Sequence, residues 1–456
     1  MVSARSQFKG GVKMADRTTR YQADSLSLVG AVALGTGVMI GAGIFALTGQ
    51  MAEMTGSLFP LAFLSAALIV SCSAYSYVKL SNAYPSAGGI AMYLEKAYGR
   101  TLTTVFHALL MYFSMVIAQS FLARTFGSYA LQLFAIDDSS LLVPALGVGL
   151  LIVAFLINLS ANRMIQGVAS TLGFIKVGGI VLFGVVGVLT ADSVEVSLST
   201  AAPGASVAGF LGATGLGILA FKGFTTIANS GSELRNPKRN LGRAIVISIA
   251  LCVVIYALVG FAVSSNLSLE SIIATRNYSL AAAARPALGE YAVWFTVVLA
   301  MLATSGGIIA SIFAVSRMLA MLTEMKLVPH RHFQMSGSIQ KHALVYTVVL
   351  GLLLTAFFDL SRIAALGITF YLVMDIAIHW GVLQHLRREI GANPVIPALA
   401  IVLDLIVLGG FLWVKVASDP LILIVALAVM AAILVTEFIF LRRQTSDGQP
   451  NHSHTD

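Results

Sequence analysis

The chain has 456 residues, of which 58% are hydrophobic and only 11% are charged. A soluble globular domain has about 25% charged residues, so this composition excludes an ordinary soluble protein and predicts a polytopic membrane protein. The net charge of +8 is typical of a membrane protein with basic loops on one side, and it does not indicate a nucleic-acid partner. Cys72 and Cys252 lie in apolar runs, which favours small core residues over a disulfide or a metal site.

Residues 1–24 are polar and rich in arginine and lysine, so we expect a cytoplasmic N-terminal tail rather than a cleavable signal peptide. Asp24 or Ser25 is expected to cap the first helix. A membrane-spanning helix needs about 20 apolar residues. Twelve apolar runs are long enough, and they cover 26–48, 56–79, 101–133, 141–160, 164–190, 206–233, 242–265, 288–322, 343–359, 361–385, 394–416 and 420–441.

The distribution of basic residues indicates how these spans are oriented. With the N-terminus inside the cell, most of the 28 Lys and Arg residues fall in inner segments, as the positive-inside rule requires. We therefore expect a multi-pass protein of the cell membrane with both termini in the cytoplasm. The longest outer loop, 266–287, is expected to shape a vestibule. Residues 442–456 are expected to form a cytoplasmic tail that is polar and disordered from Gln444 onward.

Three inner loops contain residues from which local structure can be predicted. Loop 80–100 mixes aromatic residues with glycines and is expected to contain a short interfacial helix. The charged run at 233–239, which contains Glu233 and Arg235, is interpreted as an inner-surface charge cluster or as the latch of an inner gate. Loop 323–342 holds three histidines whose spacing does not suit a metal site and which we interpret as solvated. They are His330, His332 and His342.

The first span contains a glycine-rich stretch at 35–45, with the sequence GTGVMIGAGIF. Each glycine costs about 1 kcal/mol against alanine inside a helix, and broken backbone in lipid leaves polar groups that no water satisfies. Such a stretch is tolerated where it is buried in protein or lines a cavity. Glycine then lets the chain unwind and present bare backbone to a small ligand. The alternative is a close contact between helices, which small residues also permit.

A second glycine-rich interruption lies in the sixth span, at 209–224. Five spans precede it, so the first and sixth spans hold matching places in two five-helix halves. Paired interruptions of this kind indicate a secondary transporter with inverted repeats, whose substrate lies between them near the bilayer midplane. The N-termini of half-helices present N–H groups to a carboxylate, and their C-terminal carbonyls accept from an ammonium, so the pair suits an amino acid.

Several motifs resemble those of the amino acid–polyamine–organocation (APC) transporter superfamily. They extend from the first span to the eighth in the expected order, whereas the last four spans add little. Besides the stretch 35–45, the motifs are YPSAGG at 84–89, MY at 92–93, AFKGF at 220–224, SELRNPKRN at 232–240, RML at 317–319 and KLVP at 326–329.

The resemblance implies an all-α integral membrane fold with 12 transmembrane helices. This fold is a LeuT-type 5+5 inverted repeat with broken helices 1 and 6, formed by 25–190 and 206–388, plus two extra C-terminal helices at 394–441. Phe221 and Phe224 would lie near a gate or the side-chain pocket. The implied substrate-binding residues are Ile40, Gly41, Ala42 and Gly43, whose backbone N–H groups bind the carboxylate, and Leu219, Ala220 and Phe221, whose carbonyls bind the ammonium.

Lys176 lies about twelve residues, or roughly 18 Å, into the fifth span, which is too deep for its amine to reach the interface easily. Ionisable groups inside a membrane are costly and indicate function. Burial disfavours the charged form of an amine, which suits proton exchange near neutral pH. Some APC members have a similar lysine that takes the place of a sodium ion, so the resemblance implies a role in proton coupling.

Lys222, Asp375 and His379 are further titratable residues inside predicted spans. Lys222 lies beside the predicted site, where it would favour a substrate with an extra carboxylate or neutralise Asp375. Asp375 and His379 are four residues apart on one helical face and would form a relay, with a buried structural cluster as the alternative. Asp404 and Glu437 are expected to serve packing or oligomer contacts.

The sequence thus predicts a proton-coupled amino acid permease that works by alternating access, with an amino acid, a proton and the lipid bilayer as partners and no cofactor or metal. No carboxylate accompanies the predicted site except Asp375, which favours neutral or acidic amino acids over cationic ones. The alternatives are exchange of amino acids or polyamines, and sodium coupling through Thr304 and Ser305. An enzyme would need a nucleophile–base pair or an HExxH motif, which we do not find, and paired interruptions argue against a channel. The oligomeric state stays open.

Overall fold

A computed structural model describes residues 24–86, 88–134, 136, 140–159, 162–191, 206–329 and 338–447. Over these residues the regular structure is helical, and the only strand-like pairing described is an isolated parallel bridge between Leu26 and Leu234. The prediction of an all-α fold is therefore confirmed for the described part of the chain.

Long helices are joined by short helical connections and turns. In chain order the elements are α1 (Leu28–Met39), η1 (Ile40–Ile44), α2 (Phe45–Thr55), η2 (Gly56–Leu58), α3 (Phe59–Ala83), α4 (Ile90–Tyr98), α5 (Leu102–Gln132), α6 (Leu142–Asn158), α7 (Asn162–Leu189), α8 (Val207–Phe221), α9 (Phe224–Ala228), α10 (Pro237–Asn266), α11 (Leu269–Ala274), α12 (Ser279–Leu288), α13 (Glu290–Glu324), α14 (Ile339–Phe357), α15 (Leu360–Gly381), η3 (Val382–Leu386), α16 (Val395–Ser418) and α17 (Pro420–Asp447).

Nine helical segments among the described residues are long and apolar enough to cross a membrane. Three shorter apolar helices, α1, α6 and the part of α7 from Gly173 to Leu189, lie where the sequence analysis places its first, fourth and fifth spans. The structure therefore supports a multi-pass membrane protein, and the count of twelve spans stays a prediction.

The first glycine-rich stretch remains helical. α1 leads into the five-residue π-helix η1 and then directly into α2, and the dihedral angles stay in the right-handed region, with φ −65° at Ile40 and φ −78° at Ile44. The expectation that the chain unwinds here is wrong for this conformation. A π-helix widens the turn and shifts the hydrogen-bond pattern, so the interruption needs no stretch of extended backbone.

The sixth predicted span is interrupted where α8 ends at Phe221 and α9 begins at Phe224. Lys222 and Gly223 keep helical dihedral angles, and the Lys222 N–H turns back to the carbonyl of Leu219, 3.3 Å away. A bond between residues three apart tightens the helix and changes which carbonyls are paired. The predicted interruption is thus confirmed, as a tightened turn.

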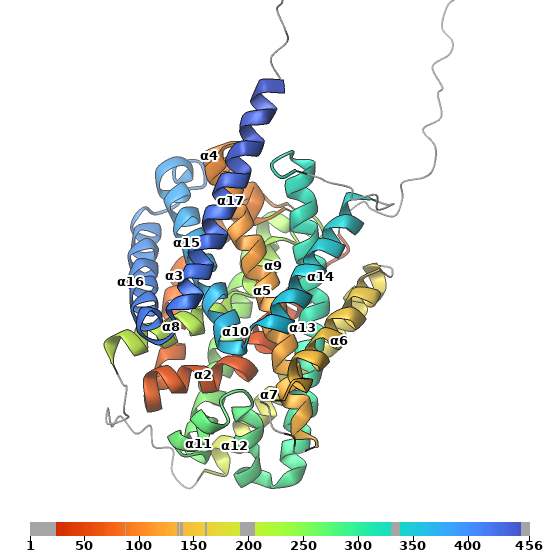
Figure 1. Ribbon diagram of the computed structural model, residues 1–456, viewed down its shortest axis with the longest axis vertical. Coiled ribbons are helices and arrows are strands. Elements are labelled where there is room, and N and C mark those ends of the chain that lie inside the picture. Colours follow the sequence, from red (N-terminus) through yellow and green to blue (C-terminus); the bar gives the residue numbers. More distant parts are fainter. Residues whose placement is uncertain are drawn as a thin grey trace, which may run out of the picture.

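The helices form a bundle in which α3, α5, α10 and α13 make many of the central contacts (Figure 1). In Figure 1, α4 lies at one end of the bundle and α11 and α12 lie at the other, and the C-terminal end of α17 extends past the α4 end. Apolar side chains such as Trp413 of α16 and Leu427 of α17 are exposed. A large apolar surface of this kind suits contact with lipid.

The ends of the bundle hold three features that the sequence addressed. α4 confirms the short helix predicted within 80–100. The N-cap of α1 is Ser27, whose hydroxyl accepts from Gly30 N at 3.1 Å, so the prediction of Asp24 or Ser25 is wrong by two or three residues. His342 is buried rather than solvated because α14 begins before it and carries it into the bundle.

Some predictions fall partly on residues that are not described. Residues 1–23 of the predicted N-terminal tail, residues 448–456 of the C-terminal tail, and His330 and His332 lie outside the described residues. α17 continues to Asp447, so the predicted tail at 442–456 begins as helix rather than as disordered chain.

Close packing between α5 and α6 generates a stability prediction. A Cβ on Gly127 of α5 would overlap the carbonyl oxygen of Val143, whereas a Cβ on Gly149 of α6 would meet nothing within 4 Å. Gly127→Ala is therefore expected to destabilise the protein by about 1–3 kcal/mol through overpacking. Gly149→Ala is expected to be neutral or stabilising by up to about 1 kcal/mol. Thermal unfolding in detergent measures both, and equal stability of the two variants would contradict the α5–α6 contact.

Candidate functional site

The two glycine-rich interruptions contact each other directly. A Cβ on Gly43 of η1 would lie 2.6 Å from the Cβ of Ala220, and one on Gly223 would lie 2.7 Å from the backbone nitrogen of Met39. Both distances are too short for real atoms, so these positions need glycine. The structure therefore brings together the two segments that the sequence analysis assigned to the substrate carboxylate and ammonium.

Tyrosine hydroxyls satisfy carbonyl groups at the interruptions. The Tyr256 hydroxyl on α10 donates to the carbonyl oxygens of Met39 at 2.7 Å and Ala220 at 3.1 Å, one from each interrupted helix. Tyr129 of α5 donates to the carbonyl oxygen of Phe45 at 2.9 Å. In a lipid environment such groups must be satisfied within the protein, so these tyrosines support the irregular backbone.

Lys176 of α7 reaches the first interruption from another side. Only 2% of its surface is exposed, and its Nζ donates to the carbonyl oxygen of Gly37 at 2.5 Å. A Cβ on Gly37 would lie 3.1 Å from the same Nζ, so the glycine leaves the space that the amine fills. The buried amine therefore contacts the backbone of α1 about one turn before η1.

The predicted substrate-binding residues lie together at the junction of η1, α8 and α9. Gly41 also faces α13, because a Cβ there would lie 2.8 Å from the carbonyl oxygen of Ala303. Ala42 belongs to the same π-helical segment. The other residues are buried, so the site is closed in this conformation. They are Ile40, Gly41, Gly43, Leu219, Ala220, Phe221 and Phe224.

Lys222 follows α8 and is also buried. Its Nζ donates to the Ser114 hydroxyl of α5 at 2.5 Å and lies 5.5 Å from the centroid of the Tyr371 ring. Among the described residues no ion pair joins Lys222 to Asp375, so the suggested neutralisation of Asp375 by this lysine is not formed here. The amine is held by a hydroxyl and an aromatic face.

Asp375 and His379 meet as the four-residue spacing predicts, and they share a buried polar cluster with α3. Asp375 accepts from the Tyr77 hydroxyl at 2.5 Å and the Ser73 hydroxyl at 2.8 Å. The His379 Nε2 lies 3.5 Å from Asp375 Oδ2, and its Nδ1 lies 2.9 Å from the Ser76 hydroxyl. The geometry is compatible with both earlier interpretations, a relay or a structural cluster.

Asp404 of α16 completes this cluster. Its Oδ2 lies 3.8 Å from His379 Nε2. One carboxyl oxygen of Asp375, one ring nitrogen of His379 and one carboxyl oxygen of Asp404 all lie within 4.8 Å of one another. Asp404 is fully buried beside His379, so of the two expected roles the structure fits packing inside the bundle rather than an exposed contact with another copy. Sequence reasoning placed α16 outside the repeats and therefore gave no reason to connect its aspartate with α15.

The α4 end of the bundle is closed by segments that flank the interrupted helices. Leu26 N donates to the Glu233 carbonyl and Arg235 N donates to the Leu26 carbonyl, each at 2.9 Å. Glu233 also forms an ion pair with Arg317 of α13, and the two side chains are largely buried. The charged run at 233–239 thus links the start of α1, the segment after α9 and α13, and the latch of an inner gate stays one of its two interpretations.

A polar cavity of about 450 Å³ opens at the opposite end, between α2, α8, α15 and α16. It is bordered by Arg276, which pairs with Glu53, and by Arg362, which donates to Asp419 at 2.7 Å. The hydrogen bond from Arg362 holds the pKa of the Asp419 carboxyl below its usual value. Arg276 belongs to the loop 266–287 and borders this cavity, and the role of the loop as an outer vestibule stays a prediction.

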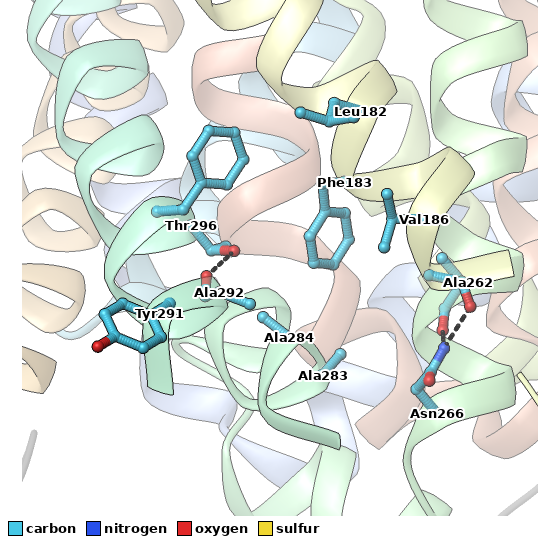
Figure 2. Close-up of a pocket in the computed structure, with 12 residues that line it drawn as sticks. Leu182, Phe183, Val186, Ala262, Asn266, Ala283, Ala284, Tyr291, Ala292 and Thr296 are labelled. Atoms are coloured by element: carbon cyan, nitrogen blue, oxygen red, sulfur yellow. Dashed lines mark hydrogen bonds between the residues drawn. The ribbon is translucent and has the colours of Figure 1, made fainter. Parts of the chain in front are cut away.

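A second cavity, of about 460 Å³, is apolar and lies between α7, α10, α12 and α13 (Figure 2). Leu182 and Phe183 line it, and the Asn266 amide donates to the carbonyls of Gly187 and Ala262 at 2.7 and 2.8 Å. None of the predicted site residues lines this cavity, and its apolar wall does not suit the two charges of an amino acid.

The sequence analysis did not identify the tyrosine hydroxyl groups that bond the interrupted helices and Asp375. Tyr256, Tyr129 and Tyr77 are tyrosines inside apolar runs, and a buried tyrosine hydroxyl usually finds a partner. That rule could have marked them as polar positions. It could not have shown that Tyr256 bonds both interrupted helices, because that depends on how α10 packs between them.

Comparison with known proteins identifies the family of this chain. A family model described as amino acid permease matches residues 26–438. The chain is similar to the inner membrane transport protein YbaT of Escherichia coli, with 28% identity over 92% of this chain and 97% of that protein.

Two further relatives match about half of the chain. Cationic amino acid transporter 9, chloroplastic, of Arabidopsis thaliana is 31% identical over 51% of this chain and 43% of its own length. The methylthioribose transporter of Bacillus subtilis is 27% identical over 53% of this chain and 55% of its own length. Because the family model covers most of the chain, and apolar helices make up most of the structure, this protein is a multi-pass membrane transporter that belongs to the amino acid permease family of the APC superfamily.

Proposed function

We propose that this protein is a secondary transporter that moves amino acids together with protons across the cell membrane by alternating access. The observation that carries the proposal is the bond from the buried Lys176 amine to the Gly37 carbonyl, beside the closed site. We propose a fold of 12 spans with both termini in the cytoplasm and a 5+5 inverted repeat. In it, α1–η1–α2 and α8–α9 are the broken first and sixth helices.

The two interruptions supply the backbone groups that an amino acid needs. Opening of the contact between Gly43 and Ala220 would expose N–H groups of η1 to a carboxylate and carbonyls of α8 to an ammonium. The Ala220 carbonyl already accepts from Tyr256, so a bound ammonium would share that oxygen or displace the hydroxyl. Substrate binding and the link between the two helices would therefore be coupled.

The coupling proton is assigned to Lys176. When protonated, its amine makes a charge-assisted bond to the Gly37 carbonyl, which is stronger than a bond from a neutral amine. Loss of the proton would weaken the hold of α7 on α1 and let the first interrupted helix move. This links the protonation of one buried side chain to the backbone that would bind substrate.

Sodium coupling fits these contacts less well. The Thr304 hydroxyl donates to the Ala300 carbonyl at 2.7 Å, and the Gly37 carbonyl is bonded to the Lys176 amine. A sodium ion at this position would have to displace an amine from a buried carbonyl oxygen. The proton is therefore the better-supported coupling ion.

Lys222 supports a preference for neutral or acidic substrates. Lys222 lies at the junction of α8 and α9, and its buried amine bonds the Ser114 hydroxyl of α5. Like charges brought together in a buried site cost several kcal/mol. A second candidate function, transport of cationic amino acids, is favoured by the name of the Arabidopsis relative. The position of Lys222 argues against it.

The latch at the α4 end explains how access would alternate. The pairing of Leu26 with the segment after α9, and the ion pair between Glu233 and Arg317, close one end of the bundle. The polar cavity bordered by Arg276 and Arg362 lies at the other end. Release of the latch would open the closed end to the proposed cytoplasmic side.

Lys176→Ala is expected to abolish uptake driven by a pH gradient in proteoliposomes. One pH unit supplies about 1.4 kcal/mol per proton, or about tenfold accumulation, and the variant should only equilibrate its substrate. Lys79→Ala is the matched control, because that amine bonds the Gly391 carbonyl at the surface. Accumulation by Lys176→Ala that still follows the pH gradient would refute the assignment of the proton.

Lys222→Met is expected to raise uptake of arginine relative to leucine by about tenfold or more, since removal of about 1.4 kcal/mol of repulsion gives a factor of ten. A panel of labelled amino acids measures this ratio. Lys415→Met is the control, because its amine lies near Ser361 at the rim of the polar cavity. An unchanged ratio of arginine to leucine uptake in Lys222→Met would show that this lysine does not determine which substrate is preferred.

Glu233→Gln is expected to weaken the latch by removing the charge opposite Arg317. A loss of about 1.4 kcal/mol would raise opening about tenfold, seen as faster hydrogen exchange of the Leu26 and Arg235 amides by mass spectrometry. Glu95→Gln is the matched control, because it breaks the more exposed pair with Arg100. Equal protection in wild type and Glu233→Gln would show that the pair does not hold this end closed.

A further inference from the structure

The buried cluster of Asp375, His379 and Asp404 has two carboxyl groups, and the described residues around them provide hydrogen-bond donors for only one of them. Asp375 has two hydroxyl donors, from Tyr77 and Ser73. Asp404 is different: it is 0% exposed, and neither of its carboxyl oxygens has a hydrogen-bond partner among the described residues. An ionised carboxylate left in this state is very costly, so Asp404 needs a positive ligand or must itself be protonated.

The geometry places an imidazole between two carboxyl groups. His379 Nε2 lies 3.5 Å from Asp375 Oδ2 and 3.8 Å from Asp404 Oδ2. Counting both carboxyl groups as ionised and the imidazole as neutral, the three side chains carry a charge of −2, so two bound protons make the cluster neutral. Release of one proton leaves a single negative charge shared by closely coupled groups. The cluster can therefore hold and release one proton as a unit.

The neighbouring titratable groups do not supply a compensating cation. Cys72 and Tyr77 of α3 and Tyr371 of α15 interact electrostatically with the aspartates. Among the described residues no lysine or arginine forms an ion pair with either carboxyl. Several other titratable residues near these elements have partners outside the cluster. They include Lys222, which bonds Ser114, Tyr112 of α5, which bonds Thr347, and Tyr98 of α4, which bonds the Ala377 carbonyl and packs on His385 of η3. Tyr75 and Lys79 of α3 bond the backbone of Asn393 and Gly391, and Glu437 lies on α17.

Tyr77 connects this cluster to the second interruption. Its hydroxyl donates to Asp375 at 2.5 Å, and its ring meets Phe224, the first residue of α9, edge to face with centroids 5.1 Å apart. A carboxylate accepts this hydroxyl proton more strongly than a neutral carboxylic acid does. The protonation state of the cluster therefore acts on the side chain that packs against the start of α9.

The arrangement parallels that of Lys176. Lys176 lies on the fifth predicted span and contacts the first interrupted helix, whereas Asp375 and His379 lie on the tenth predicted span and reach the sixth through Tyr77. In the proposed 5+5 repeat, spans five and ten hold corresponding places. Each interrupted helix would thus have its own titratable partner.

We propose that Asp375, His379 and Asp404 form a second proton-binding site, whose proton controls the second interrupted helix through Tyr77 and Phe224. The proposal rests on the proposed function, proton-coupled transport. It also gives α16 a part in the transport cycle, because Asp404 is the contribution of this helix to the site. A bound metal is the competing occupant, but Asp375 Oδ2 and His379 Nε2 already lie 2.8 and 3.1 Å from the Ser73 hydroxyl.

Asp404→Asn tests the site, because the amide has the shape of a protonated carboxyl and cannot release that proton. In proteoliposomes the variant should lose the accumulation of about tenfold per pH unit, while counterflow of labelled against unlabelled substrate at equal pH stays within about twofold of wild type. The pH profile of counterflow should also lose one titration step. Glu437→Gln is the matched control, since this buried carboxyl on α17 lies outside the cluster and should change neither measurement.

Tyr77→Phe tests the connection to α9 separately. It keeps the ring beside Phe224 and removes the hydroxyl bonded to Asp375. We expect purified Tyr77→Phe protein to release or take up the same number of protons as wild type when substrate is added, measured with a pH-sensitive dye. Accumulation driven by the pH gradient should nevertheless be lost.

The outcomes separate this site from the proposed function. If wild type shows no accumulation driven by a pH gradient, the proposed function fails. If wild type and Lys79→Ala accumulate substrate but Asp404→Asn does so equally well with an unchanged pH profile, only the second proton site is overturned. A metal bound in a one-to-one ratio by elemental analysis, with transport by wild type lost on chelation, would also overturn it.

Discussion

The need to satisfy backbone polar groups inside lipid governs this structure. Two glycine-rich helices depart from regular α-helical bonding at η1 and at the α8–α9 junction, and water cannot serve the carbonyls that this changes. Side chains from surrounding helices take its place. Lys176 bonds Gly37, Tyr129 bonds Phe45, and Tyr256 bonds both interrupted helices.

The same side-chain contacts can change with protonation or with ligand binding. A carbonyl held by a side chain can be released when that side chain changes charge or meets a competing ligand, whereas one in a regular helix is held by its own chain. Lys176 is a titratable group in this role, and Tyr256 bonds the Ala220 carbonyl, which the proposed substrate ammonium would share. Structural support and transport would therefore depend on the same atoms.

Polar and charged side chains also lie in the interior of this membrane protein. α16 exposes apolar residues such as Trp413 but directs Asp404 inward to His379. The two ends of the bundle differ as well: one is closed by the Leu26–Leu234 bridge, and the other holds a polar cavity bordered by ion pairs. A helix that the sequence suggested was peripheral thus contributes to a buried site.

The sequence by itself determined the helical membrane class, the positions of both interruptions and the deep position of Lys176 in its span, because apolar length, glycine content and a deep charge are properties of single segments. It also placed Asp375 and His379 on one face, since their spacing is local. Only the tertiary structure decided that η1 widens instead of unwinding, that Lys222 bonds Ser114 rather than Asp375, and that Asp404 joins His379. These features depend on which helices become neighbours, and contacts between residues far apart in the chain follow from packing rather than from any local pattern.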